Sequence, residues 1–327
     1  MRAWRVHELG EPEAALHLDE IDPPTPGPRE VLVDVAAASL NFPDVLMCRG
    51  EYQVKSPVPF TPGLEASGIV RAVGADADPD LVGRRVIAFS TSGSGGLAEQ
   101  TVAPTTATFP IPDSLDDAAA AALHVTYQTG HVALHRRARL QPGETLLVHA
   151  GAGGVGSAAI QLGLAAGARV IATTGGPEKV QVCRDLGAEL VLDYRSEDFV
   201  EPVNDFTDGR GADVIYDPVG GDTYDRSTKC IAFEGRILIV GFAGGRIAAA
   251  RTNHLLIKNY SVLGAYWGLY GDVRPDIVRE THDALMQLHR EGNIAPLISR
   301  EIHMLDVPAA LASLATRGTW GKIVARW

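Results

Sequence analysis

Cysteine is scarce in this chain, and the few cysteines lie far apart. The 327 residues include three, Cys48, Cys183 and Cys230. They form neither a CxxC pair nor the dense spacing of a disulfide framework, which argues against a small disulfide-stapled secreted domain. Residues 1–8 also lack the apolar core of a signal peptide. We therefore expect a reducing, cytoplasmic compartment.

Positive charge is also in short supply. Lys and Arg number 29 against 40 Asp and Glu, so the formal net charge is −11. This balance opposes attraction to nucleic acid or to anionic lipid. No Gly-x-Ser-x-Gly motif occurs, so hydrolase chemistry has no anchor. A small-molecule partner is the better expectation, with neither nucleic acid nor membrane involved.

Residues 145–168 contain no Asp, Glu, Lys or Arg, and this window superficially resembles a membrane span. Six glycines fall inside it, and three of them form the motif Gly151-x-Gly153-x-x-Gly156 directly after the apolar run 145–149. An Ala-rich helical stretch follows to about residue 166. A strand, a glycine turn and a helix in this order are typical of dinucleotide binding.

Each glycine of the motif has a separate expected role. Gly151 permits the tight turn, Gly153 lets backbone N–H groups approach a pyrophosphate, and Gly156 lets the helix pack close to the strand. The amino end of the helix then faces the phosphates, where the helix dipole favours negative charge.

The residues after the next two strands indicate which nicotinamide cofactor is used. Sites that prefer NAD place an acid about 20 residues downstream, on the adenosine ribose. Here residues 173–176 read Thr-Thr-Gly-Gly, and the first acid is Glu178. Lys179 follows it, and Tyr194 comes after the third strand. A cation and a phenol hydroxyl suit the 2′-phosphate of NADPH, although Lys179 could instead be a solvated residue in the first turn of a helix.

The chain from residue 143 onward alternates apolar strands with helical stretches. The predicted strands are 145–149, 169–173, 189–192, 213–217, 236–240 and about 261–265. This rhythm predicts a doubly wound, parallel, six-stranded sheet with helices on both faces. Pairing of the sixth strand with a symmetry mate would cover its free edge, so we expect a homodimer.

The first 120 residues differ in kind. They are rich in proline and contain short β-type runs such as 31–35 and 68–73, which predict a mostly antiparallel β domain. Residues beyond about 266 offer one amphipathic helix near 276–290 and a last strand at 321–325, too little to fold alone. We expect them to return to the first domain, with substrate binding in the crevice beside the nucleotide domain.

Several short segments resemble the medium-chain dehydrogenase/reductase superfamily, and specifically its zinc-free, zeta-crystallin-like quinone oxidoreductases. They read Leu-Asn-Phe-Pro-Asp-Val-Leu at 40–46, Arg-Gly-Glu-Tyr at 49–52, Phe-Thr-Pro-Gly-Leu-Glu at 60–65 and Gln-Pro-Gly-Glu at 141–144. Val-Gly-Phe-Ala-Gly at 240–244 and Gly-Ala-Tyr-Trp-Gly at 264–268 follow in the same order. The resemblance covers nearly the whole chain.

The resemblance implies an α/β protein in which a GroES-like, β-rich catalytic domain contains an inserted Rossmann domain. The expected boundaries are 1–122 with 266–327 for the catalytic domain and 123–265 for the NADPH-binding domain. Zinc alcohol dehydrogenases of the superfamily carry a Cys near the position of Asn41 and a His in a Gly-His-Glu triplet. This chain has Gly63-Leu64-Glu65 there, and no cysteine between Cys48 and Cys183. No metal site is therefore expected.

Without zinc, NADPH can still pass a hydride to an electrophilic acceptor such as a quinone or an enone. We predict that Asn41 and Tyr52 are catalytic and lie beside the nicotinamide, because both belong to the segment that replaces the zinc-ligand loop. A phenol hydroxyl can donate a hydrogen bond or a proton at neutral pH. Two plainer interpretations stay open: Tyr52 as a loop aromatic that closes the cleft, and Asn41 as an amide that caps the turn before Pro43.

The resemblance also implies the rest of the cofactor site. Together with Asn41 and Tyr52, the predicted NADPH-binding residues are Thr126, Ala152, Gly153, Gly154, Val155, Gly175, Lys179, Tyr194, Gly220, Phe242, Tyr266, Trp267, Gly268 and Lys322.

The leading hypothesis is a zinc-independent NADPH:quinone oxidoreductase. One alternative is a 2-enoyl-thioester reductase, whose relatives carry a proton-donating Tyr in a Gly-x-Tyr arrangement like Gly50-Glu51-Tyr52. Another is a sensor or structural protein that binds NADPH without turnover.

Overall fold

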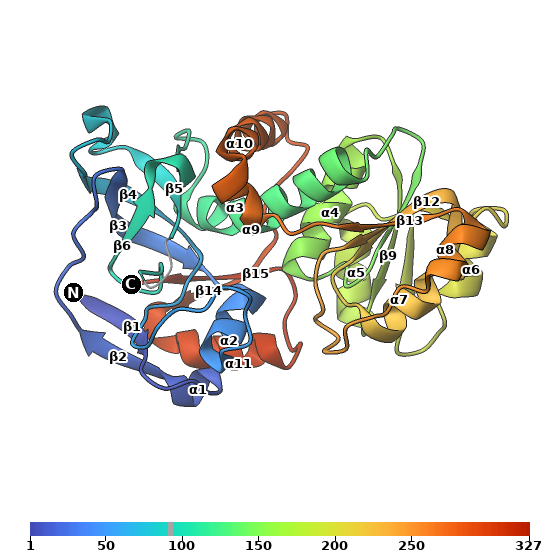
Figure 1. The fold of residues 1–327 in the computed structure, drawn as a ribbon, viewed down its shortest axis with the longest axis horizontal. Helices are drawn as coiled ribbons and strands as arrows, with labels where there is room; N and C mark the ends of the chain where they lie inside the picture. Colours follow the sequence, from blue (N-terminus) through green and yellow to red (C-terminus); the bar gives the residue numbers. More distant parts are fainter. Residues whose placement is uncertain (91–93) are drawn as a thin grey trace. The chain divides into compact units, whose positions relative to one another are not determined.

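Two compact units make up the protein, which is described by a computed structural model covering residues 1–90 and 94–327. Unit 1 comprises Met1–Val125 and Pro296–Trp327, and unit 2 comprises Thr126–Ala295 (Figure 1). Among the described residues, none of the helices combines the length and the apolar character that crossing a membrane would need.

Unit 1 is built mainly from antiparallel strands. Its largest sheet has the order β14-β15-β3-β4-β5-β7, with β6 also paired to β3, and β1 pairs with β2 in a separate ribbon. The strands are β1 (Arg2–Val6), β2 (Leu16–Glu20), β3 (Glu30–Ser39), β4 (Glu65–Val73), β5 (Arg85–Phe89), β6 (Gln100–Pro104), β7 (Thr108–Pro110), β14 (Ile298–His303) and β15 (Lys322–Arg326). The helices are α1 (Pro12–Ala15), α2 (Phe42–Arg49) and α11 (Val307–Ala315), with short 3₁₀ turns η1 (Pro79–Leu81), η2 (Thr105–Ala107) and η4 (Met304–Asp306).

The two ends of the chain share one hydrophobic core in unit 1. Trp4, Leu40 and Val45 pack in the same cluster as Leu311 and Ile323. β15 also pairs antiparallel with β3, with Val324 opposite Ser39. The last 30 or so residues therefore complete the first unit because they supply part of its core and one of its central strands.

Unit 2 contains one parallel sheet with the order β10-β9-β8-β11-β12-β13. Its strands are β8 (Thr145–Val148), β9 (Arg169–Thr174), β10 (Leu190–Asp193), β11 (Ala212–Asp217), β12 (Ile231–Ile239) and β13 (Ser261–Gly264). Its helices are α4 (Gly154–Ala165), α5 (Pro177–Asp185), α6 (Val200–Phe206), α7 (Gly221–Ser227), α8 (Thr252–Lys258), α9 (Gly268–Val273) and α10 (Pro275–Arg290). α3 (Asp117–His131), which contains the boundary between the units, continues as a π-helical segment, η3 (Val132–Arg137).

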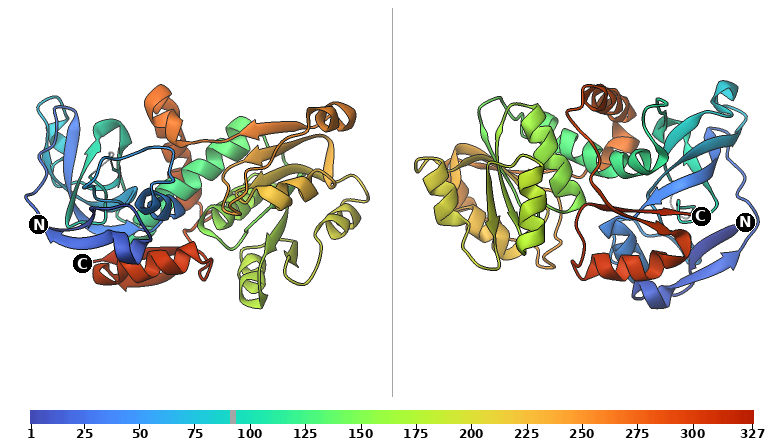
Figure 2. Two further views of the ribbon diagram at one scale, coloured as in Figure 1. Left: turned by 60° about the horizontal axis from the view of Figure 1, so that its bottom comes forward. Right: turned by 180° about the vertical axis from the view of Figure 1, so that it is seen from behind.

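This strand order confirms the predicted doubly wound sheet, and each predicted strand is present. The central strand β8 is buried at all four positions, as a strand covered on both faces requires. Side chains such as Leu147 and Ile215 pack in one cluster with Val203 of α6 and Tyr224 of α7. α4 and α5 cover the other face, so helices flank the sheet on both sides (Figure 2).

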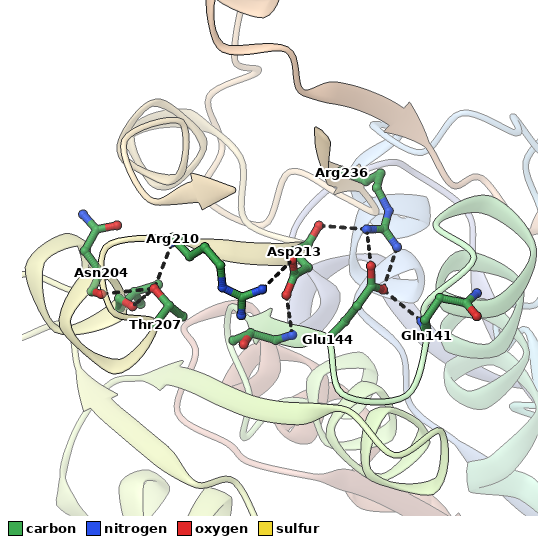
Figure 3. A network of polar contacts seen from close by, with 10 residues as sticks. Gln141, Glu144, Asn204, Thr207, Arg210, Asp213 and Arg236 are labelled. Atoms are coloured by element: carbon green, nitrogen blue, oxygen red, sulfur yellow. Dashed lines mark hydrogen bonds and ion pairs between the residues drawn. The ribbon is translucent and has the colours of Figure 1, made fainter. Parts of the chain in front are cut away.

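The amino end of this sheet carries an ion pair between Arg236 of β12 and Glu144, the residue directly before β8. Arg236 of β12 bonds both oxygens of Glu144, with Nη1–Oε1 and Nη2–Oε2 distances of 2.8 Å each (Figure 3). Glu144 also accepts the backbone N–H of Gln141, and Asp213 accepts that of Thr145. This ion pair of Arg236 and Glu144, called the clamp below, lies at the opposite end of the strands from the glycine turn.

Residues 266–295 lie with unit 2, whereas the expected boundary at 265/266 would place them with the catalytic domain. Hydrogen bonds within unit 2 explain the difference. Gln128 of α3 donates to the carbonyl of Val278 at 2.9 Å and accepts from the indole of Trp267 at 3.3 Å. The N–H of Ala295 is bonded to Gln161 of α4 at 2.7 Å. Such contacts between distant segments are not visible in local sequence patterns.

Candidate functional site

In the turn between β8 and α4, Ala150 lies in the left-handed region, with φ of 52°. Gly151, the next residue, is required for space, because a Cβ there would lie 2.9 Å from the Cβ of Ala172 and 3.0 Å from the sulfur of Cys183. A Cβ on Gly156 would lie 2.2 Å from the carbonyl oxygen of Ala150, so the helix packs against the turn as closely as expected.

The amino end of α4 offers backbone donors to a ligand. Gly153 is the N-cap, and no side chain caps the helix in the described part of the chain. A Cβ at Gly153 would lie 3.3 Å from the carbonyl oxygen of Ala150. The first N–H groups of a helix have no partners inside the helix, and its dipole favours an anion at this end. The geometry therefore fits a pyrophosphate beside residues 152–155.

A buried histidine fixes the strand end beneath this turn. His149 lies 2.8 Å from the hydroxyls of both Thr173 and Ser227. Ser227 donates its own hydrogen to the carbonyl of Thr223, so it accepts from Nε2 of His149, and Nδ1 accepts from Thr173. Burial lowers the pKa of His149 to about 3, so the ring is neutral. This supports a structural role.

The ends of β9 and β10 bring together a group that suits the adenosine end of a dinucleotide. A Cβ on Gly175 would lie 2.6 Å from the hydroxyl of Tyr194 and 3.0 Å from Nε of Arg195, so these side chains lie directly over the glycine. Burial and then the nearby charge of Arg195 lower the pKa of Lys179. Two cations and a phenol thus gather around Gly175 and Gly176, which suits a dianionic phosphate.

Arg195 is not among the residues predicted from the sequence, although it directly follows Tyr194 at the end of β10. Tyr194 was chosen because it follows a strand of the parallel sheet, and the same reason applies to Arg195. Asp193 holds this segment in place, because its carboxylate accepts the N–H groups of Gly176 and Arg195, each at 3.0 Å. These bonds lower the pKa of Asp193.

The remaining predicted residues of unit 2 differ in how far their side chains are exposed. Gly220 has φ of 70°, and a Cβ there would lie 3.0 Å from the ring of Phe242, so these two are neighbours. Tyr266 is about half exposed and its hydroxyl is close to Gly268. The side chains of Thr126 and Trp267 are buried.

Three of the predicted residues, Asn41, Tyr52 and Lys322, belong to unit 1. Lys322 is buried, and its ammonium donates to Leu40 O at 3.1 Å, Asn41 Oδ1 at 2.6 Å and Glu65 Oε1 at 3.0 Å. Asn41 donates both amide hydrogens, to Ser39 O at 3.2 Å and to Glu65 Oε1 at 3.0 Å. Asn41 and Lys322 therefore lie together, with their side-chain donors directed at other residues of unit 1.

Tyr52 lies farther along the same segment. Gly50 caps the carboxyl end of α2 in the left-handed conformation, with φ of 67°. The carbonyl of Leu46 accepts the N–H groups of Glu51 and Tyr52. Tyr52 borders a pocket of about 340 Å³ whose apolar lining includes Leu9, Met47 and Phe60. An apolar pocket beside a phenol can take a flat, weakly polar molecule.

Metal ligands are not grouped in the described residues, where no three His, Cys, Asp or Glu side chains are arranged to hold an ion. The positions that carry zinc ligands in zinc alcohol dehydrogenases are Asn41 and Leu64, and neither side chain is a typical zinc ligand.

Comparisons with known proteins agree with this architecture. Residues 27–113 match the model of the alcohol dehydrogenase GroES-like domain, and residues 154–283 match that of the zinc-binding dehydrogenases. A quinone oxidoreductase-like protein 2 homolog of Nematostella vectensis is 39% identical over 325 residues, which are 99% of this chain and 88% of the relative. The chain belongs to the quinone oxidoreductase-like family of medium-chain dehydrogenases/reductases.

Other proteins similar to this quinone oxidoreductase-like chain include a quinone oxidoreductase, a protein solved with NADPH and an enoyl reductase. A quinone oxidoreductase of Pseudomonas aeruginosa is 35% identical over 319 residues, with 96% of each chain covered. A mycobacterial protein solved with NADPH has a TM-score of 0.92 at 30% identity, with both chains covered fully. The CurK enoyl reductase has a TM-score of 0.89 at 27% identity, covering 99% of this chain and 98% of that one. The chain is thus an oxidoreductase with a fold that binds nicotinamide cofactors.

Proposed function

We propose that this chain is a zinc-independent oxidoreductase that transfers a hydride from NADPH to a quinone or a similar activated carbonyl acceptor. The observation that carries the proposal is the group of Lys179, Tyr194 and Arg195 around Gly175. Two cations there favour the additional phosphate of NADPH, and a carboxylate at the end of β9, which would repel it, is absent from the sequence 173–176. The replacement of the zinc ligands at Asn41 and Leu64 supports metal-free chemistry.

The protein's own part in this reaction is to bind and to orient. The uncapped amino end of α4 receives the pyrophosphate, and the basic group around Gly175 receives the 2′-phosphate. When bound, NADPH supplies the hydride. Reduction of a quinone to a hydroquinone takes up one hydride and one proton, and the developing oxyanion needs a hydrogen-bond donor. We assign that donation to the hydroxyl of Tyr52, with the adjacent apolar pocket receiving the acceptor.

Oxidation of NADPH by simple quinones, followed by absorbance in the presence of a chelator, tests this function. Turnover that survives chelation is the expected result. Absence of turnover across a broad panel of benzoquinones and naphthoquinones would exclude a quinone reductase. In the same assay, we expect a preference for NADPH over NADH of about tenfold or more. Equal affinity for the two cofactors would contradict the assignment of the basic group.

Reduction of an enoyl thioester is the second candidate. Its specific support is the similarity to the CurK enoyl reductase and the Gly50-Glu51-Tyr52 sequence. Proton delivery to carbon requires the Tyr52 hydroxyl, whereas a quinone oxygen can take its proton from water. If Tyr52→Phe abolishes reduction of a crotonyl thioester and leaves quinone reduction intact, Tyr52 is the acid of the enoyl reaction, and the hydrogen bond assigned to it in quinone reduction is not required. If the parent never reduces the thioester, this candidate is wrong.

We further propose that the protein is a homodimer paired through β13. β13 is the edge strand of the unit 2 sheet, and the helix directly before it exposes Leu256 and Ile257 by 77% and 75%. An open strand edge beside exposed apolar side chains is costly in a monomer.

A further inference from the structure

Lys322 is an uncommon side chain in this molecule because its charged end is buried. Its side chain is 4% exposed, and that of its partner Glu65 is 0% exposed. An ammonium has three N–H donors, and here Leu40 O, Asn41 Oδ1 and Glu65 Oε1 take all three. Lys322 thus joins segments that are 257 to 282 residues apart in the chain.

The acceptors of Lys322 are themselves fixed by further bonds. The second oxygen of Glu65 accepts the backbone N–H of Val125 at 2.7 Å. Asp44, in the first turn of α2, accepts the N–H of Asn41 at 2.7 Å and that of Gly63 at 3.1 Å. The network therefore holds the amino end of α2 against the segment 63–65.

Stability alone gives no reason for this arrangement. A buried ion pair is often no more stable than well-packed apolar side chains of the same volume, because both ions lose their hydration. The network does, however, set the start of α2, whose other end positions Tyr52 through the carbonyl of Leu46. It also includes Asn41, at one of the two positions where zinc-dependent relatives carry ligands, and Glu65, which directly follows the other, Leu64.

We propose that Lys322 is a positioning residue, a cation built into the chain that orders the segment from Leu40 to Tyr52 as a metal ion would order its ligands. This inference rests on the proposed function for its catalytic consequence only. Lys322 is assigned no contact with cofactor or acceptor, since its three donors are already used within unit 1.

Two variants test the proposal. Lys322→Met removes the cation and leaves the buried carboxylate of Glu65 without a counter-charge, although the donors of Asn41 and Val125 remain. The double variant Lys322→Met with Glu65→Gln removes both charges, so it separates loss of charge balance from loss of the three donated bonds. Arg236→Met is the matched control, because it breaks an ion pair at the far end of the unit 2 sheet. We would measure thermal stability, NADPH affinity, kcat and KM for a quinone, and amide hydrogen exchange in α2.

For the Lys322→Met protein we expect kcat to fall about 10- to 100-fold, as for a misplaced reactive group, with NADPH affinity within about threefold. Exchange of the α2 amides should speed up by about tenfold or more. The double variant should regain thermal stability but neither kcat nor slow exchange, because Leu40 and Asn41 still lack their donor. The Arg236→Met protein should lose stability and keep kcat.

Two results would overturn the proposal. One is full recovery of kcat and of slow α2 exchange in the double variant, since Lys322 would then only balance the charge of Glu65. The other is unchanged α2 exchange in Lys322→Met. If the parent reduces no quinone, the proposed function fails, and the exchange comparison still decides the role of Lys322.

Discussion

Lys179 and Arg195 lie on two different segments, yet their charges interact, and Arg195 lies over the glycines at the end of β9. A charge-assisted hydrogen bond to the 2′-phosphate contributes more to binding than a neutral one, because the anion is held by full charges. Each should therefore contribute to the choice of NADPH over NADH, with Tyr194 adding a neutral hydroxyl.

We expect Lys179→Ala and Arg195→Ala each to reduce the preference for NADPH over NADH by roughly 1–3 kcal/mol. Affinity for NADH should change little, because NADH lacks the phosphate that these cations contact. Fluorescence titration with both cofactors measures the ratio, and Lys229→Ala, an exposed lysine of the same unit, is the control. A ratio that stays constant in both test variants would place the phosphate elsewhere.

The carboxyl of Asp44 should make the stability of the protein depend on pH. Burial raises its pKa to about 7, although the N–H groups of Asn41 and Gly63 and the charge of Lys322 oppose the shift. The charge of Glu65 adds to the increase. The folded state thus favours the protonated carboxyl. Its contribution to stability is fully present below the ordinary pKa of 3.8 and is lost as the pH rises through about 7.

The free energy of unfolding should accordingly decline between pH 4 and 7 by an amount on the order of a few kcal/mol through this one group. Asp44→Asn should be less stable overall, because an amide offers a poorer match to two N–H donors. Its stability should nevertheless depend less on pH across the same window. Urea unfolding of both proteins at several pH values measures the difference, and parallel pH profiles would show that Asp44 is ionised throughout.

At the scale of elements, the two ends of the parallel sheet of unit 2 carry different groups of residues. The carboxyl ends of β8, β9 and β10 carry the glycine turn and the basic group. The amino ends carry the clamp between Arg236 and Glu144, in which both residues are mostly buried (Figure 3). Hydrogen bonds with Arg236 lower the pKa of Glu144 even though burial raises it.

Replacing Arg236 by Lys should destabilise the protein by about 1–2 kcal/mol, because an ammonium cannot bond both carboxylate oxygens in parallel. The exposed pair of Arg169 and Glu189 provides the control, and Arg169→Lys should cost less than about 0.5 kcal/mol. Chemical unfolding gives both values. Cofactor affinity should not change in either variant, and a loss of affinity in Arg236→Lys would show that the two ends of the sheet are coupled.

The elements themselves were largely predictable, because helices and strands of unit 2 follow local patterns. All six predicted strands occur, and the helix expected near 276–290 is α10. The turn was less predictable. Ala150 adopts the left-handed conformation although it is not a glycine. The space available to a Cβ at Gly151 depends on Ala172 and Cys183, which come from other elements.

At the scale of the whole molecule, the predicted dimer can be tested directly. We expect light scattering to give twice the mass of the 34.7 kDa chain. Changing Leu256 and Ile257 together to Asp should yield monomers, because the paired surface would carry buried like charges. A monomeric parent would contradict pairing through β13, and a dimeric double variant would move the interface to another surface.

The glycine turn, the six-strand rhythm and the loss of zinc-type ligands at Asn41 and Leu64 can all be read from the sequence, because each depends on residues close together in the chain. Lys179 and Tyr194 follow from the rule that the ends of parallel strands meet at one edge. The buried network of Lys322, Asn41 and Glu65 could not be found in this way. It exists only because β15 pairs with β3, and such long-range pairing is decided by the packing of the whole core.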